Sequence, residues 1–323
     1  MVTIEEVLPN LFRVEIPLPD NPLKAINSYF VKAERRSLII DTGMNCEECI
    51  CALYSALKRV EVSLSRTDFF ITHFHPDHLG LVPKLATNRS FVYFNRKDAE
   101  FLRHMNTYLS KLPNFARRNG FPENELREAL KKHPGYRYGA AGSVEFTILK
   151  DGDTIFVGDY LFKCIETPGH TSGHLCLYEP NQKIFLAGDH VLENVTPIIS
   201  LWLDEGTPLK EYLVSLDKVY DLEVNIVLPG HGGIFKDLRR RVEELKKHHR
   251  KRAAEIIKIL KKERINAYQI AVKMKWNINH SFWEFPASQK WFAVGETLAH
   301  LKYLEEEGIV GRRLESEEII FEV

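Results

Sequence analysis

Short apolar runs alternate with polar turns through most of the first 230 positions, and glycine, proline or aspartate follows many of them. Runs of this length, bounded by turn residues, are typical of β-strands. Residues 46–60 and 208–220 instead carry apolar side chains at helical spacing, and a further helix is expected to end near Thr87. The predicted strands are 11–16, 26–31, 37–40, 68–73, 91–94, 144–149, 154–157, 161–166, 174–178, 183–187 and 224–228. We therefore expect an α+β fold.

A stretch of helical character, residues 96–141, interrupts this series of strands. It holds ten basic and five acidic residues between positions 96 and 137, together with several aromatic side chains. Proline breaks helices, so the stretch is expected to be interrupted at Pro113, Pro122 and Pro134. An insertion between strands commonly forms a lid or substrate wall, and a solvated surface element is the equal alternative.

The C-terminal part of the chain has a different pattern. It predicts a long helix at 236–262, two further helices at 266–275 and 288–307, and short strands at 310–314 and 319–323. The long helix has twelve Lys/Arg and four Asp/Glu, a net charge of +8. Two helices followed by a hairpin is the order of a winged helix. We therefore divide the chain into a domain at 1–240 and a basic linker helix with a winged-helix-like domain at 241–323.

Overall composition restricts the function only weakly. The 323 residues include 44 basic and 44 acidic side chains, so net charge favours no particular partner. Cys46-x-x-Cys49 resembles half of a zinc or redox site, but no second CxxC completes it, and reduced thiols are the simpler interpretation. Residues 1–10 lack a signal-peptide pattern, and no run approaches the roughly 18 apolar residues that span a bilayer. We expect a cytoplasmic protein without membrane contact.

The chemistry is concentrated in residues 73–78, His-Phe-His-Pro-Asp-His, directly after the apolar run 69–71. Imidazole nitrogen and carboxylate oxygen are the ligands that borderline divalent metals prefer. At a strand end, His73 and His75 can point to one side because they are two residues apart. A helix that starts at Pro76 would place Asp77 and His78 in its first turn. Two ligand sets would then diverge from one loop, which is enough for two metals.

Three further ligand candidates lie in separate loops, each just after a predicted strand and beside glycine or proline. They are His170, Asp189 and His231. Small neighbouring residues let the backbone approach closely, so strand ends could deliver all three side chains to one rim. Catalytic metal sites leave positions open to water, and seven ligands for two metals allow a shared solvent position. A purely structural metal site is the competing, non-enzymatic hypothesis.

Other histidines have simpler explanations. His174 and His190 are both expected to be packed and hydrogen-bonded. His190 has the better claim to a catalytic proton or substrate role, because it directly follows Asp189. The pair His248-His249 is expected to lie on the solvated surface of the basic helix.

These residues, in this order, resemble the metallo-β-lactamase-fold hydrolases over roughly residues 1–240. The resemblance implies an αβ/βα sandwich: two mixed β-sheets face to face, helices outside, and metals at one rim. The implied ligands are His73, His75 and His170 for the first metal, Asp77, His78 and His231 for the second, and Asp189 bridging both with a water or hydroxide. Asp41 matches a position that supports the ligands from behind. Zn²⁺ is the expected metal, with Fe or Mn as alternatives.

The same resemblance separates branches of the family. True β-lactamases of this fold usually lack an aspartate at the bridging position, so Asp189 argues against antibiotic hydrolysis. It points to the glyoxalase II, lactonase and nuclease branches. The C-terminal module differs from the helical region with which glyoxalase II-like enzymes grip glutathione, so glutathione thioesters are not favoured. The catalytic candidates are Asp77 and Asp189 with the bridging water, and the candidates for a leaving-group acid are His104, Tyr108, Tyr136 and Tyr138.

Two substrate classes remain open. The favoured one is a small-molecule ester, thioester or lactone beneath a lid formed by the insertion. The alternative is a phosphodiester, because a core with a C-terminal winged helix resembles lactamase-like proteins that include a single-strand endoribonuclease, and the basic segments could track phosphates. Residues 300–323 carry seven acids and three bases, which suits a phosphate backbone poorly. We therefore expect the C-terminal module to serve packing or homodimerisation.

Overall fold

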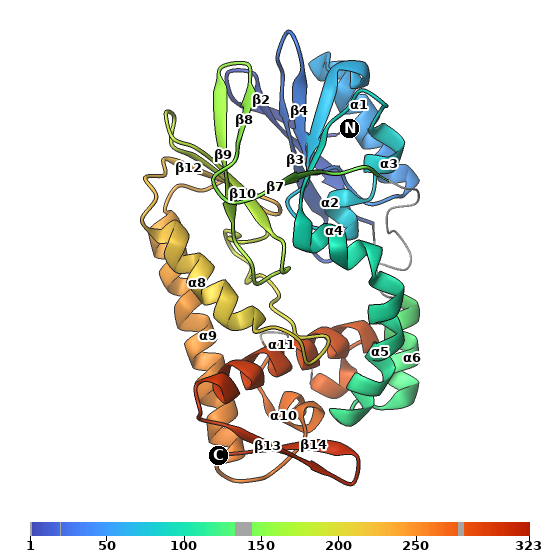
Figure 1. Ribbon diagram of the computed structural model, residues 1–323, viewed down its shortest axis with the longest axis vertical. Helices are drawn as coiled ribbons and strands as arrows, with labels where there is room; N and C mark the ends of the chain where they lie inside the picture. The colour runs from blue at the N-terminus through green and yellow to red at the C-terminus, as the bar shows by residue number, and fades with distance from the viewer. Residues whose placement is uncertain (1, 20, 133–143, 277–280) are drawn as a thin grey trace.

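Two β-sheets lie face to face in the upper half of the molecule, with a helical region below them (Figure 1). The computed structural model describes residues 2–19, 21–132, 144–276 and 281–323. The first sheet has the order β1 (Ile4–Leu8), β2 (Leu11–Pro17), β3 (Ala25–Val31), β4 (Ser37–Ile40), β5 (Thr67–Phe70), β6 (Val92–Asn95) and β7 (Thr147–Leu149). Its pairs are antiparallel up to β4 and parallel from β4 to β7.

The second sheet has five strands and is also mixed. Its order is β12 (Ile226–Pro229), β11 (Ile184–Gly188), β10 (Leu175–Glu179), β9 (Tyr160–Glu166) and β8 (Thr154–Val157). Only β11 and β12 run parallel among its pairs. The predicted sandwich of two mixed sheets is confirmed.

Side chains that alternate inward along both sheets form the core between them. Phe70 of the first sheet and Phe162 and Leu177 of the second are fully buried there. Burying each such side chain stabilises the fold by about 1.5–3 kcal/mol. The outer face of the first sheet packs against α1 (Glu47–Val60), the short α2 (Pro76–Leu79) and α3 (Val82–Leu85), and α4 (Arg96–Arg103). The outer face of the second sheet packs against α8 (Pro208–Tyr220) and α9 (Leu238–Leu260).

The insertion begins with α4 and continues as α5 (Met105–Arg118) and α6 (Glu123–Lys132). Our prediction that Pro113 would interrupt a helix is wrong, because α5 continues through it. A proline inside a helix removes one backbone hydrogen bond. Leu112 and Ala116 of the same helix are buried in the core, and this packing holds the helix together across the proline.

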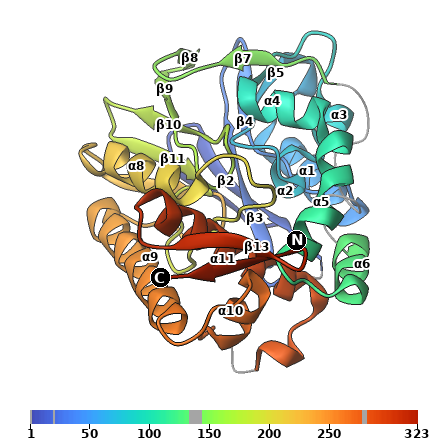
Figure 2. The ribbon, with the colours of Figure 1, turned by 60° about the horizontal axis from the view of Figure 1, so that its bottom comes forward.

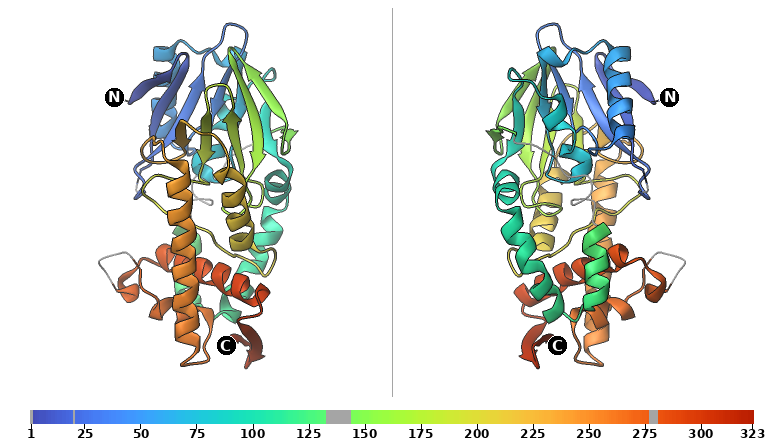
Figure 3. Two further views of the ribbon diagram at one scale, coloured as in Figure 1. Left: turned by 90° about the vertical axis from the view of Figure 1, so that its left-hand side faces the viewer. Right: turned by 90° about the vertical axis from the view of Figure 1, so that its right-hand side faces the viewer.

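The C-terminal region contains α9, α10 (Ala267–Lys273), α11 (Ala287–Glu306) and the hairpin of β13 (Gly311–Glu315) and β14 (Glu318–Glu322). Two 3-10 turns, Leu64–Arg66 and Phe282–Glu284, complete the described elements. α9 runs as one helix from beside the second sheet to the C-terminal module (Figure 3). The domain boundary at residue 240 stays a prediction, and it falls within this helix.

One apolar core joins the C-terminal module to the insertion and to the second sheet. Figure 2 shows the module turned forward, with α10 and α11 between α9 and α6. In this core, the rings of Trp202 and Trp291 stack at 4.7 Å, and Phe121 of the insertion meets Trp291 edge-on at 5.5 Å. The carboxylate of Glu125 in α6 accepts a hydrogen bond from Lys290 Nζ in α11 at 2.7 Å. The insertion therefore rests on α11.

Our prediction of a solvated His248-His249 pair is wrong for His249, which is 2 % exposed. Its Nδ1 lies 3.2 Å from Nε2 of His300 in α11, and its ring meets Tyr212 of α8 edge-on at 5.4 Å. At His249, α9 is therefore covered by α11 and by α8. In the part of the chain that the structure describes, no helix is long and apolar enough to cross a membrane.

Gly295 tests the docking of α11. A Cβ atom at this position would lie 2.8 Å from the ring of Trp202, whose stacking on Trp291 prevents it from moving aside. We expect Gly295→Ala to destabilise the protein by about 1–3 kcal/mol, the usual cost of overpacking, although alanine is the better helix former. Urea unfolding measures this change.

Gly311→Ala is the matched control, because the nearest atom to its Cβ is 3.9 Å away. The control is expected to stay within about 0.5 kcal/mol of the unsubstituted protein. A Gly295→Ala protein as stable as the control would mean that α11 does not pack on Trp202.

Candidate metal centre

The loop after β5 carries four of the seven predicted ligands. Thr72, at the start of this loop, donates its backbone N–H to Asp41 Oδ1 at 2.9 Å and anchors the turn. His75 is the N-cap of α2, and Pro76 takes the first helical position, which suits its fixed φ. The first turn of α2 then presents Asp77 and His78, as the spacing predicted.

The other three candidates follow strands of the second sheet. His170 comes after β9, Asp189 after β11 and His231 after β12. Glycine is required at two of these strand ends. A Cβ on Gly188, whose φ is +50°, would lie 2.9 Å from the Cβ of Thr72, and a Cβ on Gly230 would lie 3.1 Å from Cε1 of His78. These close approaches bring the second sheet's loops against the loop after β5.

Three imidazoles form what we call the first group: His73, His75 and His170. His75 Nδ1 lies 2.9 Å from His73 Nε2 and 3.0 Å from His170 Nε2. The other nitrogen of His170, Nδ1, donates to the carbonyl oxygen of Ile198 at 2.8 Å. This hydrogen bond leaves the Nε2 lone pair of His170 directed at the group.

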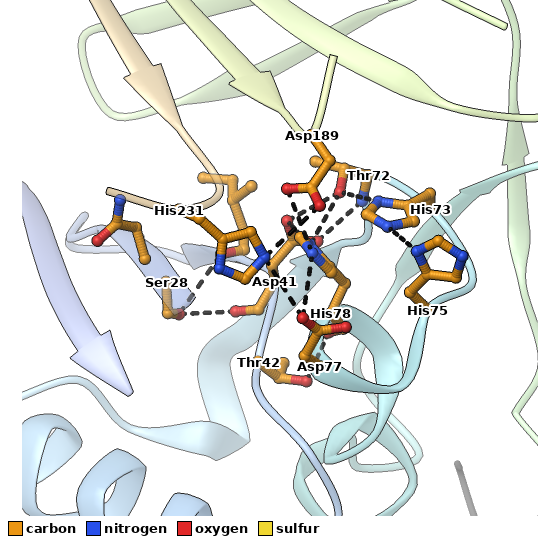
Figure 4. Close-up of polar contacts among 12 residues, drawn as sticks. Ser28, Asp41, Thr42, Thr72, His73, His75, Asp77, His78, Asp189 and His231 are labelled. Carbon is orange, nitrogen blue, oxygen red and sulfur yellow. Dashed lines mark hydrogen bonds and ion pairs between the residues drawn. The ribbon is translucent and has the colours of Figure 1, made fainter. Parts of the chain in front are cut away.

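The second group consists of Asp77, His78 and His231. Asp77 Oδ2 lies 3.3 Å from His231 Nε2 and 3.9 Å from His78 Nε2. His231 Nδ1 donates to the carbonyl oxygen of Ala25 at 2.9 Å, so its Nε2 faces the group. Figure 4 shows the second group beside His73 and His75 of the first.

Asp189 lies between the two groups. Its Oδ1 is 3.5 Å from His78 Nε2, and its Oδ2 is 3.5 Å from His231 Nε2 and 3.6 Å from His170 Nε2. One carboxylate thus faces histidines of both groups. Figure 4 shows it beside His78 and His231 of the second group. This is the geometry that a bridging ligand requires.

Asp41 supports the second group from behind. It adopts a left-handed backbone conformation with φ of +57°. Its Oδ2 accepts hydrogen bonds from Thr72 Oγ1 at 2.8 Å and His78 Nδ1 at 2.7 Å. Because the Nδ1 proton is held by Asp41, the Nε2 of His78 is the atom that faces Asp77 and Asp189.

The charges of the two groups differ. Burial, together with the neighbouring imidazoles of His170 and His78, lowers the pKa of His75 to about 3. His73 and His170 also have lowered pKa values, chiefly because of burial. In the second group burial again lowers the pKa of His78, but Asp41, Asp189 and Asp77 outweigh it and raise the value well above normal. Burial opposes the low pKa of Asp189, and the nearby His231 and His78 hold it down.

Unpaired polar atoms show that these residues fit divalent cations. His78 Nε2, His231 Nε2 and Asp189 Oδ1 are buried and have no hydrogen-bond partner among the described residues. Buried polar atoms are normally satisfied, so three such atoms that converge on one point indicate a missing partner. Imidazole and carboxylate donors suit Zn²⁺ and related divalent ions. The residues therefore fit the two metals that the sequence implied.

His174 and His190, which lie next to the ligand groups without belonging to them, are both buried. His174 accepts from the backbone N–H of Asp189 at 3.1 Å and its Nδ1 lies 2.8 Å from Thr167 Oγ1, so the prediction of a packed, hydrogen-bonded residue is confirmed. The His190 ring packs against Tyr212 at 5.3 Å as predicted, but the prediction of a hydrogen-bonded side chain is wrong, because neither of its nitrogens makes a hydrogen bond of normal geometry within the described residues. It belongs to neither ligand group, and a catalytic role for it stays a prediction.

The candidates for a leaving-group acid and the cysteine pair do not lie together. His104 is exposed at the end of α4, and Tyr108 is partly buried in α5. Tyr136 and Tyr138 lie outside the described residues. The Cys46 thiol donates to Cys49 Sγ at 3.3 Å without a disulfide between them, and the carbonyl oxygen of Pro17 accepts from Cys49.

One buried residue beside the centre escaped sequence reasoning. Asp98 in α4 is 0 % exposed and accepts hydrogen bonds from the loops that carry the first group. Burial raises its pKa to about 7, and hydrogen bonds from Thr171, Gly173 and Phe74 oppose this shift. An acidic residue in the first turn of a helix is ordinary, so the sequence offered no signal for it.

Comparison with known proteins agrees with this geometry. The model of the metallo-beta-lactamase superfamily matches residues 22–231. The chain is 26% identical to a beta-lactamase-like protein 2 homolog of Caenorhabditis elegans, across 89% of this chain and 81% of that protein. It is also 26% identical to the probable metallo-hydrolase YqjP of Bacillus subtilis, across 91% of this chain and 92% of that protein.

Two further similarities extend this result. An atrochrysone carboxyl ACP thioesterase of Aspergillus fumigatus is 25% identical across 76% of this chain, which spans 47% of that protein. The crystal structure of the metallo-beta-lactamase family protein TTHA1429 from Thermus thermophilus superposes with a TM-score of 0.84 at 28% identity, covering 98% of this chain and 99% of that chain. The chain belongs to the metallo-beta-lactamase superfamily and is a metallo-hydrolase of that fold.

Proposed function

We propose that the protein is a dinuclear metal-dependent hydrolase of small-molecule esters, thioesters or lactones. The observation that carries the proposal is Asp189, whose two oxygens face histidines of both ligand groups. We assign His73, His75 and His170 to one metal, Asp77, His78 and His231 to the other, and Asp189 to both. Zn²⁺ is the proposed metal, with Fe or Mn as alternatives, and divalent ions supply Lewis acidity and lower the pKa of water.

The surrounding residues prepare the centre for this chemistry. Asp41 holds His78 in the tautomer that turns Nε2 inward, and the carbonyl oxygens of Ala25 and Ile198 do the same for His231 and His170. Fixed orientation matters because ligands that need not reorganise cost no free energy at the moment of reaction. Two dications held there would outweigh the charges of Asp77 and Asp189, and the remaining positive field would polarise the bond under attack.

The role of the C-terminal module favours a small substrate over nucleic acid. In a winged helix that reads a groove, the second of the two helices before the hairpin must be accessible. More than half of the residues in α11 are instead buried, among them Trp291, Val294 and Leu298. The hairpin carries Glu315, Glu318 and Glu322, which would repel phosphate. A phosphodiesterase or endonuclease therefore remains the weaker alternative, and homodimerisation through this module stays a prediction.

The insertion supplies an apolar wall next to the first group. The rings of Phe74, Phe101 and Tyr108 form what we call the aromatic row. Phe74 meets the ring of His75 edge-on at 4.9 Å and stacks on Phe101 at 4.3 Å, and Phe101 lies 4.9 Å from Tyr108. We propose that this row contacts the apolar acyl portion of the substrate, so the insertion is a substrate wall rather than a solvated surface element.

Two further observations support the proposed substrate class and the proposed location. The thioesterase among the relatives acts, by its name, on an acyl carrier protein thioester, and thioesters are one of the proposed substrate classes. The five free cysteines suit a reducing compartment, which is consistent with the proposed cytoplasmic location.

Asp189→Asn tests the dinuclear assignment. The amide keeps the shape of the side chain but removes its charge and leaves one oxygen for two metals. Substitution of a residue that only supports a metal ligand lowers activity by up to ~100-fold. Because Asp189 is proposed to be a ligand itself, we expect kcat/KM for aryl esters and thioesters to fall by more than this, and bound metal to fall in parallel. Initial-rate kinetics and elemental analysis measure both quantities.

Asp159→Asn is the control, since Asp159 is exposed in the turn between β8 and β9. Its activity and metal content are expected to match the unsubstituted protein. Undiminished turnover by Asp189→Asn would sink the bridging assignment.

Phe101→Ala tests the aromatic row. Loss of one aromatic contact of ~1.4 kcal/mol should lower kcat/KM about 10-fold for thioesters with long or aromatic acyl groups. Acetyl thioesters are too short to reach the row and should change much less. Phe156→Ala is the matched control, because Phe156 is 74 % exposed on β8. An equal loss for short and long acyl groups would contradict the substrate-wall role.

Competition with RNA separates the two substrate classes. If the substrate is a small molecule, a single-stranded RNA oligonucleotide at physiological salt should leave ester hydrolysis unchanged and should not be cleaved. Bis(p-nitrophenyl) phosphate should be turned over more slowly than an aryl ester. Cleavage of the oligonucleotide with kcat/KM above that of every ester and thioester tried would establish the alternative function instead.

A further inference from the structure

Asp98 connects the two loops that carry the first group, the loop after β5 and the loop after β9. Its side chain is fully buried, and its carboxylate accepts three hydrogen bonds. Oδ2 accepts from the backbone N–H of Phe74 at 3.0 Å and from Thr171 Oγ1 at 2.8 Å. Oδ1 accepts from the backbone N–H of Gly173 at 2.8 Å.

The donors stand directly beside ligands of the first group. Phe74 lies between His73 and His75 in the loop after β5 of the first sheet. Thr171 follows His170 in the loop after β9 of the second sheet. One carboxylate thus joins the two loops that bring all three imidazoles together, although the loops belong to different sheets.

The close approach is built into the backbone. A Cβ atom on Gly173 would lie 2.6 Å from both the backbone nitrogen and Oδ1 of Asp98, so only glycine fits there. Asp98 itself sits in the first turn of α4, whose N-cap Asn95 accepts from the backbone N–H of Lys97 at 2.8 Å. The beginning of the insertion therefore has a fixed position relative to the two ligand loops.

The second group has separate supports. His78 is held by Asp41 and His231 by the carbonyl oxygen of Ala25, and neither contact involves Asp98. A defect at Asp98 should consequently act on one group and leave the other in place.

We propose that Asp98 is a positioning residue for the first metal group: it sets the distance between the His73–His75 loop and the His170 loop. The insertion thereby contributes to the metal centre itself, in addition to its contact with substrate. This inference rests on the proposed function only in that the two groups bind metal.

The test compares Asp98→Asn with Thr171→Val by metal titration against a chromophoric chelator, with Zn²⁺ as the probe. An asparagine has only one oxygen to accept from the three donors that Asp98 serves, and its amide N–H₂ would face at least one of these donors. We expect it to weaken one of two Zn²⁺ sites by about 10–100-fold and leave the other unchanged. Thr171→Val keeps the shape, removes one hydrogen bond and should weaken the same site by less.

His170→Ala and His231→Ala identify the affected site. Asp98→Asn combined with His170→Ala should lose no more metal than His170→Ala alone, because both act on the first group. Combined with His231→Ala, it should weaken both sites, since changes at separate groups add.

Asp68→Asn is the control for loss of a buried carboxylate. Asp68 in β5 is 7 % exposed, accepts from Phe91 N–H at 2.8 Å and pairs with Arg36, and neither of these partners lies in a ligand loop. It should lower stability in urea without changing either Zn²⁺ site. Two unchanged sites in Asp98→Asn, or equal weakening of both sites by Asp98→Asn and Asp68→Asn, would overturn the inference. An unsubstituted protein that binds no Zn²⁺, Fe²⁺ or Mn²⁺ would instead overturn the proposed function.

Discussion

The carboxylate of Asp189 is the constraint on which the rest of the centre depends, because it stands between two groups of ligands from different loops. Like charges and desolvation make such a buried carboxylate costly unless cations compensate it. His78 and His231 supply part of that compensation, and they hold the pKa of Asp189 well below its ordinary value. Within the described parts of the chain, His78 Nε2 and Asp189 Oδ1 are buried without a hydrogen-bond partner, so the side chains there do not complete the compensation. Two divalent cations would complete it.

The sandwich delivers these ligands because four strand ends meet at one rim. Glycines at positions 188 and 230 let the loops of the second sheet approach the loop after β5 more closely than any side chain would permit. The insertion and the C-terminal module form a second layer of support. Their common core links α5, α6, α10 and α11 to the outer face of the second sheet. Contacts such as Glu125 to Lys290 then place the aromatic row beside His75. We propose that the C-terminal module supports the substrate site through this packing alone.

Much of this structure could be predicted from the sequence, since it follows from local pattern. Strand runs ending in glycine or proline located His170, Asp189 and His231, and the spacing of His73 and His75 required only a strand end. The features that escaped depend on how one segment pairs or packs with another. β1 was missed because a bulge between Glu6 and Leu8, where it pairs with β2, breaks its alternation.

His249 and Asp98 escaped for a related reason. His249 lies on a basic helix, and only the packing of α8 and α11 decides that its side is buried. Asp98 resembles any acidic residue at a helix start until the loops of two sheets converge on it. Sequence pattern therefore located the candidate ligands, whereas the residues that support them required the assembled fold.

The most direct test of the account is hydrolysis of an aryl ester or acyl thioester measured against the number of metal ions per chain, starting from protein stripped by a chelator. The account predicts two tightly bound ions per chain, no turnover in the stripped protein, and full recovery of turnover only as the second ion binds. Full activity in the metal-free protein, or saturation at a single ion with Asp189 dispensable, would contradict it.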